Sequence, residues 1–319
     1  LDEALARHPV IGGVVGDQRP LAAVLRTPFV HQHPIVLDDQ AGFDTAQANP
    51  NHATPHGQMA DLHYVPISLQ LEQPLQSVAP AGGAWSDVQD LARYLITQLH
   101  AGVAPDGRRV VSAENLKVTW QPQVQTDPQG KQWYALGWGV GSYKGVHLLT
   151  HNGGTSGFSS NLTFLPDAGL GIAVLTNAQT NNIPTAAFVR VLELVYGLPM
   201  EADARYAQRV AQAQQAVRDQ LAQLLAHLDL AAVAPYQGIY TNPSLGAVTL
   251  VLTGEKLVLD TGTFSTELRS VGNGMYLVWD PPLVGMQVKL DHDAAGQPIW
   301  QLISPDPDQP GTYPFTRVH

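Results

Sequence analysis

From residue 237 onward the sequence consists of short apolar segments separated by turn residues, and this pattern limits the fold more than any other feature. Each segment has the length of a β-strand, and turns such as Thr253–Glu255 and Asp293–Gly296 lie between them. Eight short strands at this spacing predict a small all-β domain, a closed barrel or a meander, over residues 235–319. The predicted strands are Gln237–Tyr240, Ala247–Thr253, Lys256–Asp260, Thr266–Ser270, Met275–Trp279, Gln287–Asp291, Ile299–Ile303 and Tyr313–Val318.

The segment before this domain has a different composition. Residues 201–230 are rich in alanine and glutamine and contain no glycine or proline, which favours one long helix. We therefore predict a connecting helix within residues 201–234. The same helix would also suit an oligomer contact with a second helix, but a solvated connector is the preferred interpretation.

Residues 86–197 alternate between helical and strand-like patterns. Ser86 and Gln89 have the spacing of a capping box, and apolar residues then recur at helical spacing. Further helices are predicted over Ser112–Trp120 and Thr185–Tyr196. Short apolar strands between these helices predict an α+β domain with an antiparallel sheet. The predicted strands are Tyr134–Tyr143, Val146–His151, Phe158–Leu165 and Leu170–Asn177.

The composition argues against several classes of protein. With 27 acidic and 17 basic residues the net charge is −10, and no stretch is rich in lysine or arginine, so a nucleic-acid partner is not expected. Cysteine is absent, which excludes disulfides and thiolate chemistry. No apolar run reaches the roughly 18 residues of a transmembrane helix, so none is predicted. Residues 1–40 show little periodicity and stay unplaced.

One stretch of residue types points to chemistry. A predicted strand ends in His151-Asn152-Gly153-Gly154, and small residues then lead into a second apolar strand. This resembles the third conserved element of serine β-lactamase-like and penicillin-binding-protein-like hydrolases, in the His-x-Gly form that replaces Lys-Thr-Gly in the esterase and peptidase branches. Other stretches resemble the family in the right order, and we assign residues 41–200 to the later part of such a hydrolase domain. They are Ala79–Ser86, Asp90–Leu95, Asp106–Ser112 and Leu136–Gly139.

The resemblance implies a role for each residue of this stretch. Glycine lets a substrate lie against the backbone, because no Cβ is in the way. The backbone N–H of Gly154 would be one donor of an oxyanion hole, and His151 would be a polar assistant near the nucleophile. The residues that would line the substrate are Asn152, Gly153, Thr155 and Ser156.

The resemblance also implies a reaction. We expect hydrolysis of an ester or an amide in a small-molecule or peptide substrate, through an acyl-enzyme, without a metal or organic cofactor. A periplasmic or secreted location follows from the same resemblance. The C-terminal Tyr236–Tyr240 and Phe315–Arg317 segments resemble an appended lipocalin-like domain, and both a structural and a substrate-gating role stay open for it.

The nucleophile of that family is missing from the sequence. It lies in Ser-x-x-Lys, where the lysine takes the proton of the serine, but none of the five lysines follows a serine at this spacing. The second motif, Tyr-x-Asn, occurs only at Tyr240–Asn242, within the predicted β domain. We therefore expect a truncated, processed or damaged chain, completed by an N-terminal fragment or associating as a homo-oligomer. The alternatives are a non-catalytic binding module and, less favoured, recruitment of Ser156 or Ser159 by His151.

Two further patterns are interpreted without a function. The pairs His31/His33 and His52/His56 have metal-like spacing, but no convincing third ligand accompanies them. Asn161–Thr163 is a glycosylation sequon that falls in a predicted strand, so we interpret it as chance.

Overall fold

A computed structural model describes residues 11–12, 22–25, 42–179, 182–304 and 311–318 of the chain. The chain divides into two compact units, one of residues up to 53 and 72–208, the other of residues 54–71 and 209–319. Residues 54–71 thus belong with the C-terminal part, which nothing in the sequence pattern indicated. The predicted domain boundaries concern which segments fold independently, and they stay a prediction. Residues 31 and 33 and most of residues 1–40 lie outside the described residues.

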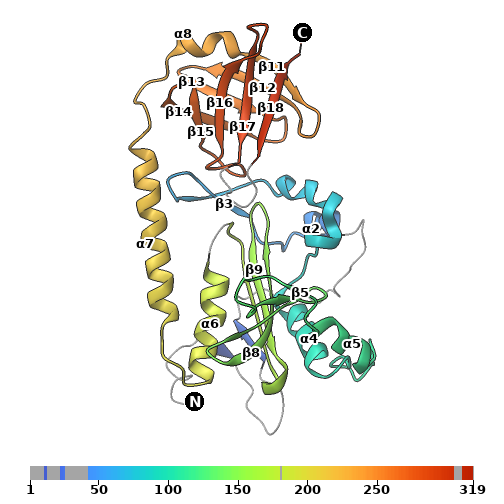
Figure 1. The fold of residues 1–319 in the computed structure, drawn as a ribbon. Coiled ribbons are helices and arrows are strands. Elements are labelled where there is room, and N and C mark those ends of the chain that lie inside the picture. Colours follow the sequence, from blue (N-terminus) through green and yellow to red (C-terminus); the bar gives the residue numbers. More distant parts are fainter. Residues whose placement is uncertain (1–10, 13–21, 26–41, 180–181, 305–310, 319) are drawn as a thin grey trace. The chain divides into compact units, whose positions relative to one another are not determined.

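The first unit contains an eight-stranded sheet in the order β1-β2-β10-β9-β8-β7-β6-β5 (Figure 1). β10 runs parallel to β2, and the other neighbouring pairs are antiparallel. The strands are β1 (Ile11–Gly12), β2 (Ala22–Leu25), β5 (Val124–Gln125), β6 (Trp133–Tyr134), β7 (Gly139–Tyr143), β8 (Val146–Gly154), β9 (Ser159–Leu165) and β10 (Leu170–Thr176). This arrangement confirms the predicted α+β class.

Helices cover both faces of this sheet because successive strand residues point to opposite sides. Leu149 and Phe164 form a buried cluster with Leu95 of α4 (Val88–Leu99), whereas Leu148 and Leu165 pack with α6 (Ile183–Val195) on the other face. The remaining helical segments of this unit are α2 (Gly42–Ala48), α3 (Ala79–Gly82), α5 (Ala113–Trp120) and η2 (Pro166–Ala168), while η1 (Leu69–Val78) spans the boundary between the units.

The structure corrects two local predictions and confirms a third. The N-cap of α4 is Asp87, which accepts from the N–H groups of Gln89 and Asp90, each at 2.9 Å, so the predicted capping box at Ser86 is wrong by one residue. A carboxylate suits the positive end of the helix dipole. α5 follows its N-cap Ser112, the residue at which the sequence predicted a helix to start. The predicted strand Tyr134–Tyr143 is two strands, because Gly137 at φ 83° reverses the chain between them.

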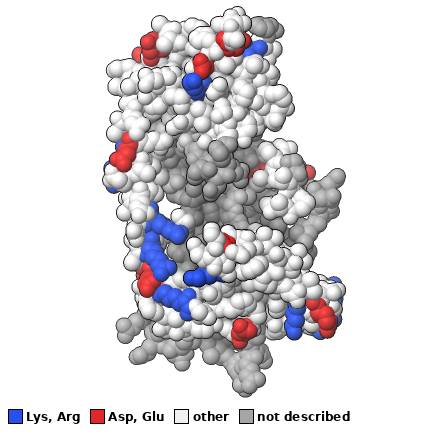
Figure 2. Space-filling view, viewed as in Figure 1, with Lys and Arg blue, Asp and Glu red and all other residues white. Residues whose placement is uncertain are grey.

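The predicted connecting helix is shorter than expected. α7 (Ala202–Leu221) ends where Leu221 and Leu224 join a buried cluster around Trp279, and the Leu225 N–H donates to the Ser270 carbonyl at 2.8 Å. Packing against the barrel therefore outweighs the helix propensity of the later residues. α7 itself is largely exposed, and positive and negative side chains lie next to one another along it (Figure 2).

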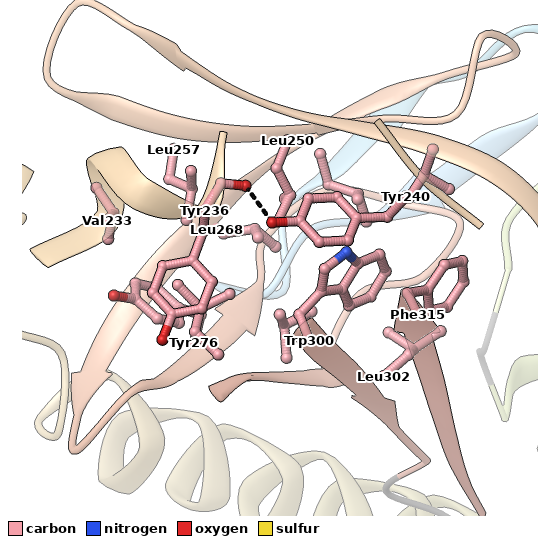
Figure 3. Close-up of a cluster of buried hydrophobic side chains, with 14 of the residues drawn as sticks. Val233, Tyr236, Tyr240, Leu250, Leu257, Leu268, Tyr276, Trp300, Leu302 and Phe315 are labelled. Atoms are coloured by element: carbon pink, nitrogen blue, oxygen red, sulfur yellow. Dashed lines mark hydrogen bonds between the residues drawn. The ribbon is translucent and has the colours of Figure 1, made fainter. Parts of the chain in front are cut away.

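The C-terminal domain is a closed barrel of eight antiparallel strands, β11 to β18 in order, as the sequence predicted. Its inward side chains fill the interior: the Trp300 and Phe315 rings stack with centroids 4.0 Å apart, and the Tyr240 hydroxyl donates to the Tyr236 carbonyl at 2.9 Å (Figure 3). The interior is thus a packed core. A relation to lipocalins stays a prediction. The elements are α8 (Leu230–Val233), η3 (Ala234–Tyr236), β11 (Gly238–Asn242), β12 (Gly246–Thr253), β13 (Lys256–Asp260), β14 (Ser265–Gly272), β15 (Met275–Val278), β16 (Gln287–His292), β17 (Pro298–Ile303) and β18 (Thr312–Arg317).

A hairpin from the first quarter of the sequence packs on this barrel. It consists of β3 (His56–Gln58) and β4 (Tyr64–Pro66). The Ala60 N–H donates to the Trp279 carbonyl at 3.1 Å, and both residues are buried. Gly57 is needed here, because a Cβ at this position would lie 2.4 Å from the Cβ of Pro281.

Candidate functional site

The last four residues of β8 have a strand neighbour on one side only. β8 pairs with β9 as far as Gly154 opposite Ser159. On its other side it pairs with β7, which begins at Gly139 opposite Thr150. No strand among the described residues therefore pairs with 151–154 on that side, and all four residues are exposed. Such an open edge offers backbone donors and acceptors to an extended ligand.

The two glycines of this segment serve different purposes. A Cβ at Gly153 would lie 2.3 Å from the Ser160 hydroxyl, so this glycine relieves a cross-strand contact. A Cβ at Gly154 would meet nothing within 4 Å. Gly154 thus leaves open space beside the strand edge.

His151 is paired with a tyrosine that the sequence analysis did not single out. The Tyr134 hydroxyl lies 3.0 Å from His151 Nε2, and the two rings meet edge to face with centroids 6.1 Å apart. Tyr134 lies opposite Gly139, which lies opposite Thr150, so its ring reaches across the start of β7. The distance in sequence hid this pair, because Tyr134 is 17 residues from His151.

Asn152 does not join this pair. Alternation along β8 places His151 and Asn152 on opposite faces. The Asn152 Oδ1 accepts from Asn161 Nδ2 at 2.6 Å, and Asn161 is fully buried. The structure thus places His151 beside Tyr134. Asn152 lies beside Asn161 on the opposite face of the sheet, the face that packs against α6. His151 and Asn152 are nevertheless both exposed at the end of β8. Burial of Asn161 also fits the interpretation of its sequon as chance.

The turn after β8 is held by a buried carboxylate. Glu72, 2% exposed, accepts the Gly157 N–H at 2.8 Å, and the Thr155 N–H donates to the Phe158 carbonyl. Burial raises the pKa of Glu72, and hydrogen bonding by Thr155 and Gly157 offsets only part of this rise. Glu72 Oε2 and the Thr155 hydroxyl are nevertheless buried without a hydrogen bond of ordinary geometry. Thr155 therefore faces Glu72, a residue 85 positions from Gly157 that the sequence analysis missed.

An aromatic row supports the same turn. The Trp85 ring meets Phe158 edge to face at 5.7 Å and Phe43 at 6.2 Å between centroids. The predicted motif segment 79–86 thus contacts the turn through Trp85.

Neither serine considered as a substitute nucleophile gains support from this geometry. The Ser159 hydroxyl is buried and donates to the Ala178 carbonyl at 2.9 Å. Ser159 also lies opposite Gly154, three register positions from the partner of His151. Ser156 lies in the turn and has partners of its own. Within the described part of the chain, no group of three or more His, Cys, Asp or Glu side chains is arranged to hold a metal ion.

The comparisons with known proteins identify a family for the part of the chain that contains this strand. The Beta-lactamase family model matches residues 26–195, which is more than half of the 319 residues. The chain belongs to the beta-lactamase family. The match begins before residue 41, where the resemblance in the sequence was expected to begin.

Two curated relatives of this beta-lactamase-family chain are hydrolase or penicillin-binding proteins. The chain is 32% identical over 121 residues to the unguisins hydrolase of Aspergillus campestris, covering 37% of this chain and 21% of that protein. It is 35% identical over 106 residues to penicillin-binding protein 4 of Amycolatopsis lactamdurans, covering 32% and 28%. The chain thus spans only about a fifth to a quarter of these relatives.

Solved structures give a weaker likeness. The penicillin-binding protein homologue from Pyrococcus abyssi, described as octameric, is 15% identical with a TM-score of 0.40, covering 85% of this chain and 55% of that one. SurE is 16% identical with a TM-score of 0.35, covering 85% and 56%. Scores this low carry no argument about function. Among the described residues, none of the helices combines the length and apolar character that crossing a membrane requires.

Proposed function

We propose that the end of β8 is the substrate-binding strand of a serine hydrolase that cleaves an ester or an amide through an acyl-enzyme. The observation that carries this proposal is the one-sided pairing of residues 151–154, because an extended backbone with a free edge can hold a substrate like an added strand. The open space at Gly154 gives room for the acyl group. Membership of the beta-lactamase family supports the type of reaction.

Residues at the end of β8 would stabilise the negative charge that develops on the substrate during the reaction. The serine oxygen bonds to the substrate carbonyl carbon, the leaving group departs with a proton, and water then cleaves the acyl-enzyme ester. The carbonyl oxygen carries negative charge in between, and the Gly154 N–H is our candidate donor for it. Loss of one such donor typically lowers turnover roughly 10²–10³-fold. His151, bonded to Tyr134, would be the polar assistant beside it.

The serine itself has to come from elsewhere. The sequence contains neither Ser-x-x-Lys nor a Tyr-x-Asn outside the barrel domain. We therefore propose that a segment outside residues 1–319 supplies the nucleophile and its base. The same absence favours a second candidate, a non-catalytic module that binds a ligand or partner on this strand.

A fluorophosphonate probe separates these functions. The purified chain would be incubated with the probe alone and with a polypeptide that carries Ser-x-x-Lys and Tyr-x-Asn from a beta-lactamase-family relative. Intact-mass analysis should find an adduct only in the mixture, on the serine of the added segment, and none when that serine is alanine. Gly154→Val should slow labelling because its side chain fills the open space beside the edge. Gly141→Val is the matched control, since the same sheet leaves ordinary contact distances at that position.

Two results would contradict the proposal. An adduct on a serine of this chain alone would mean that the nucleophile lies within these residues. A complex that forms without any labelling would favour the binding module instead.

A further inference from the structure

Four polar side chains form a hydrogen-bonded group beneath the exposed end of β8. They are two cross-strand pairs, with Thr150 opposite Thr163 and Asn152 opposite Asn161. Asn161 and Thr163 are fully buried, whereas Asn152 lies at the exposed outer end. Buried polar groups are unfavourable unless they are hydrogen-bonded, so the bonding within this group decides which way each side chain is turned.

The inner three side chains close a ring. Asn161 Nδ2 donates to Thr150 Oγ1 at 3.1 Å, and Asn161 Oδ1 accepts from the Thr163 hydroxyl at 2.8 Å. The two threonine oxygens lie 2.8 Å apart. The Thr163 proton goes to Asn161, and the Thr150 hydroxyl also donates to the Leu162 carbonyl at 3.2 Å, an oxygen that can only accept. The second proton of Asn161 Nδ2 leaves the ring and goes to Asn152 Oδ1 at 2.6 Å.

Counting donors fixes this direction. The ring admits one other arrangement, in which both amide groups are turned round and every bond is reversed. Asn161 Oδ1 would then lie 3.1 Å from the Thr150 oxygen, whose proton goes to the Leu162 carbonyl, so two acceptors would meet without a proton between them. Such a contact is unfavourable, whereas in the arrangement of the structure both protons of Asn161 Nδ2 are bonded. The direction of the ring in turn fixes Asn152, because only its Oδ1 can accept from Asn161.

We propose that Asn161 is a positioning residue, which turns the amide of Asn152 so that the NH₂ group faces outward and makes this position specific for an acceptor oxygen of the ligand. The acceptor would be a carbonyl or a carboxylate oxygen, since Asn152 Nδ2 then offers two protons and no partner for them is recorded among the described residues. The inference rests on the proposed function only in taking the end of β8 as a binding site.

Side-chain amide NMR of the ¹⁵N-labelled chain tests the orientation directly. The NH₂ group of Asn161 should exchange with solvent about tenfold or more slowly than that of Asn152, because both of its protons are bonded and buried. Asn152→Asp assigns the Asn152 signals by removing them. N-acetylglycinate, which carries a carbonyl and a carboxylate, should shift the Asn152 signals saturably and leave the Asn161 signals unchanged.

Asn161→Asp should reverse the orientation. A carboxylate only accepts, so Asn152 has to turn round and donate to it. The Asn152 NH₂ signals should then become protected, and their response to N-acetylglycinate should fall at least about tenfold. Thr163→Val is the matched control, because it opens the ring but leaves Asn161 able to donate to Asn152. Asn161→Ala, which leaves Asn152 free to rotate, serves if Asn161→Asp does not fold, as judged from the backbone amide signals of β8 and β9.

Several outcomes would overturn the inference. If the exposed Asn152 NH₂ group of the wild-type chain is itself protected from exchange, it donates to Asn161, and the direction of the ring is the opposite one. If Asn161→Asp leaves the Asn152 signals unchanged, Asn161 does not position Asn152. If the orientation is right but N-acetylglycinate has no effect on the Asn152 signals, the proposed specificity of Asn152 for an acceptor oxygen is wrong. None of these measurements needs catalysis, so a failed labelling experiment would remove the hydrolase role and leave this result standing.

Discussion

Two buried carboxylates of the first unit differ in the donors around them: Glu193 at the junction of α6 and α7, and Glu72 beside the turn between β8 and β9. Glu193 is fully buried and accepts from the Tyr143 hydroxyl at 2.9 Å and from the N–H groups of Glu201 and Ala202 at 2.9 and 3.1 Å. Glu72 is almost as buried, but the one bond of ordinary geometry that it accepts from the described residues is that of the Gly157 N–H at 2.8 Å. One carboxylate thus has a full set of donors and the other does not.

The difference shows in their pKa values. Burial raises the pKa of Glu193, but the N–H groups, the Tyr143 hydroxyl and the Lys144 ammonium together lower it below the ordinary 4.5. Burial also raises the pKa of Glu72, and there the donors are too few to reverse the rise. The number of donors, and not burial alone, therefore decides whether a buried carboxylate is favoured as an ion. The junction has the chemistry of a structural anchor, whereas the turn beside the candidate site holds a carboxyl group whose pKa is raised by burial.

Removal of the better-bonded carboxylate should have the largest effect. Glu193→Ala leaves two backbone N–H groups and the Tyr143 hydroxyl without their acceptor, and should lower the free energy of unfolding by about 3 kcal/mol. Urea denaturation followed by tryptophan fluorescence measures this. Glu201→Gln is the control: it removes a partner of the same Lys144 at an exposed site, and should shift the midpoint much less. Equal effects of the two variants would mean that the ion pair, and not the buried bonds, stabilises the junction.

A matched pair of hydroxyl deletions compares the two sites at a smaller scale. Tyr143→Phe removes the 2.9 Å hydrogen bond from the Tyr143 hydroxyl to Glu193 and should lower the free energy of unfolding by about 1–2 kcal/mol. Thr155→Val removes a hydroxyl that has no bond of ordinary geometry to Glu72, and should change the unfolding free energy by less than about 0.5 kcal/mol. Both follow from urea midpoints at pH 7. If Thr155→Val costs as much as Tyr143→Phe, Thr155 bonds to Glu72 in solution and the contrast between the sites is smaller than the structure indicates.

The sequence predicted those parts of the fold that depend on local pattern. The eight barrel strands and the main strands of the sheet follow from short apolar segments between turn residues, and the start of α5 at Ser112 was also predicted. The predicted end of α7 was wrong, because Leu221 and Leu224 contact residues far along the chain. These contacts end the helix at a point where propensity alone would continue it. Local pattern carries no information about such contacts.

The candidate site divides along the same line. The sequence could single out residues 151–154, because a histidine and two glycines at a strand end form a recognisable pattern. It could not single out Tyr134 or Glu72, since their roles arise only when the sheet brings them to His151 and Gly157. The partners of Asn152 were equally hidden, because an asparagine and two threonines within predicted strands look like ordinary strand residues until the register places them opposite one another.

A change of pH tests the sign of the comparison. The folded-state pKa of Glu72 is raised above 4.5, so its contribution to stability is fully present below pH 4.5 and is lost as the pH rises through the folded-state value. Glu72→Gln keeps an acceptor for the Gly157 N–H, gains a donor for the Thr155 hydroxyl and cannot ionise. It should therefore be more stable than the wild type at pH 7, by up to about 1 kcal/mol, and the difference should shrink near pH 4.

For Glu193, whose folded-state pKa is lowered, the contribution to stability is present above pH 4.5 and is lost as the pH falls. Glu193→Gln should therefore be less stable than the wild type at pH 7, and the difference should narrow in acid. Urea midpoints of both variants at pH 7 and pH 4 measure the two trends, and a Glu72→Gln variant that is less stable than the wild type at pH 7 would show that Glu72 is stabilised as an ion, like Glu193.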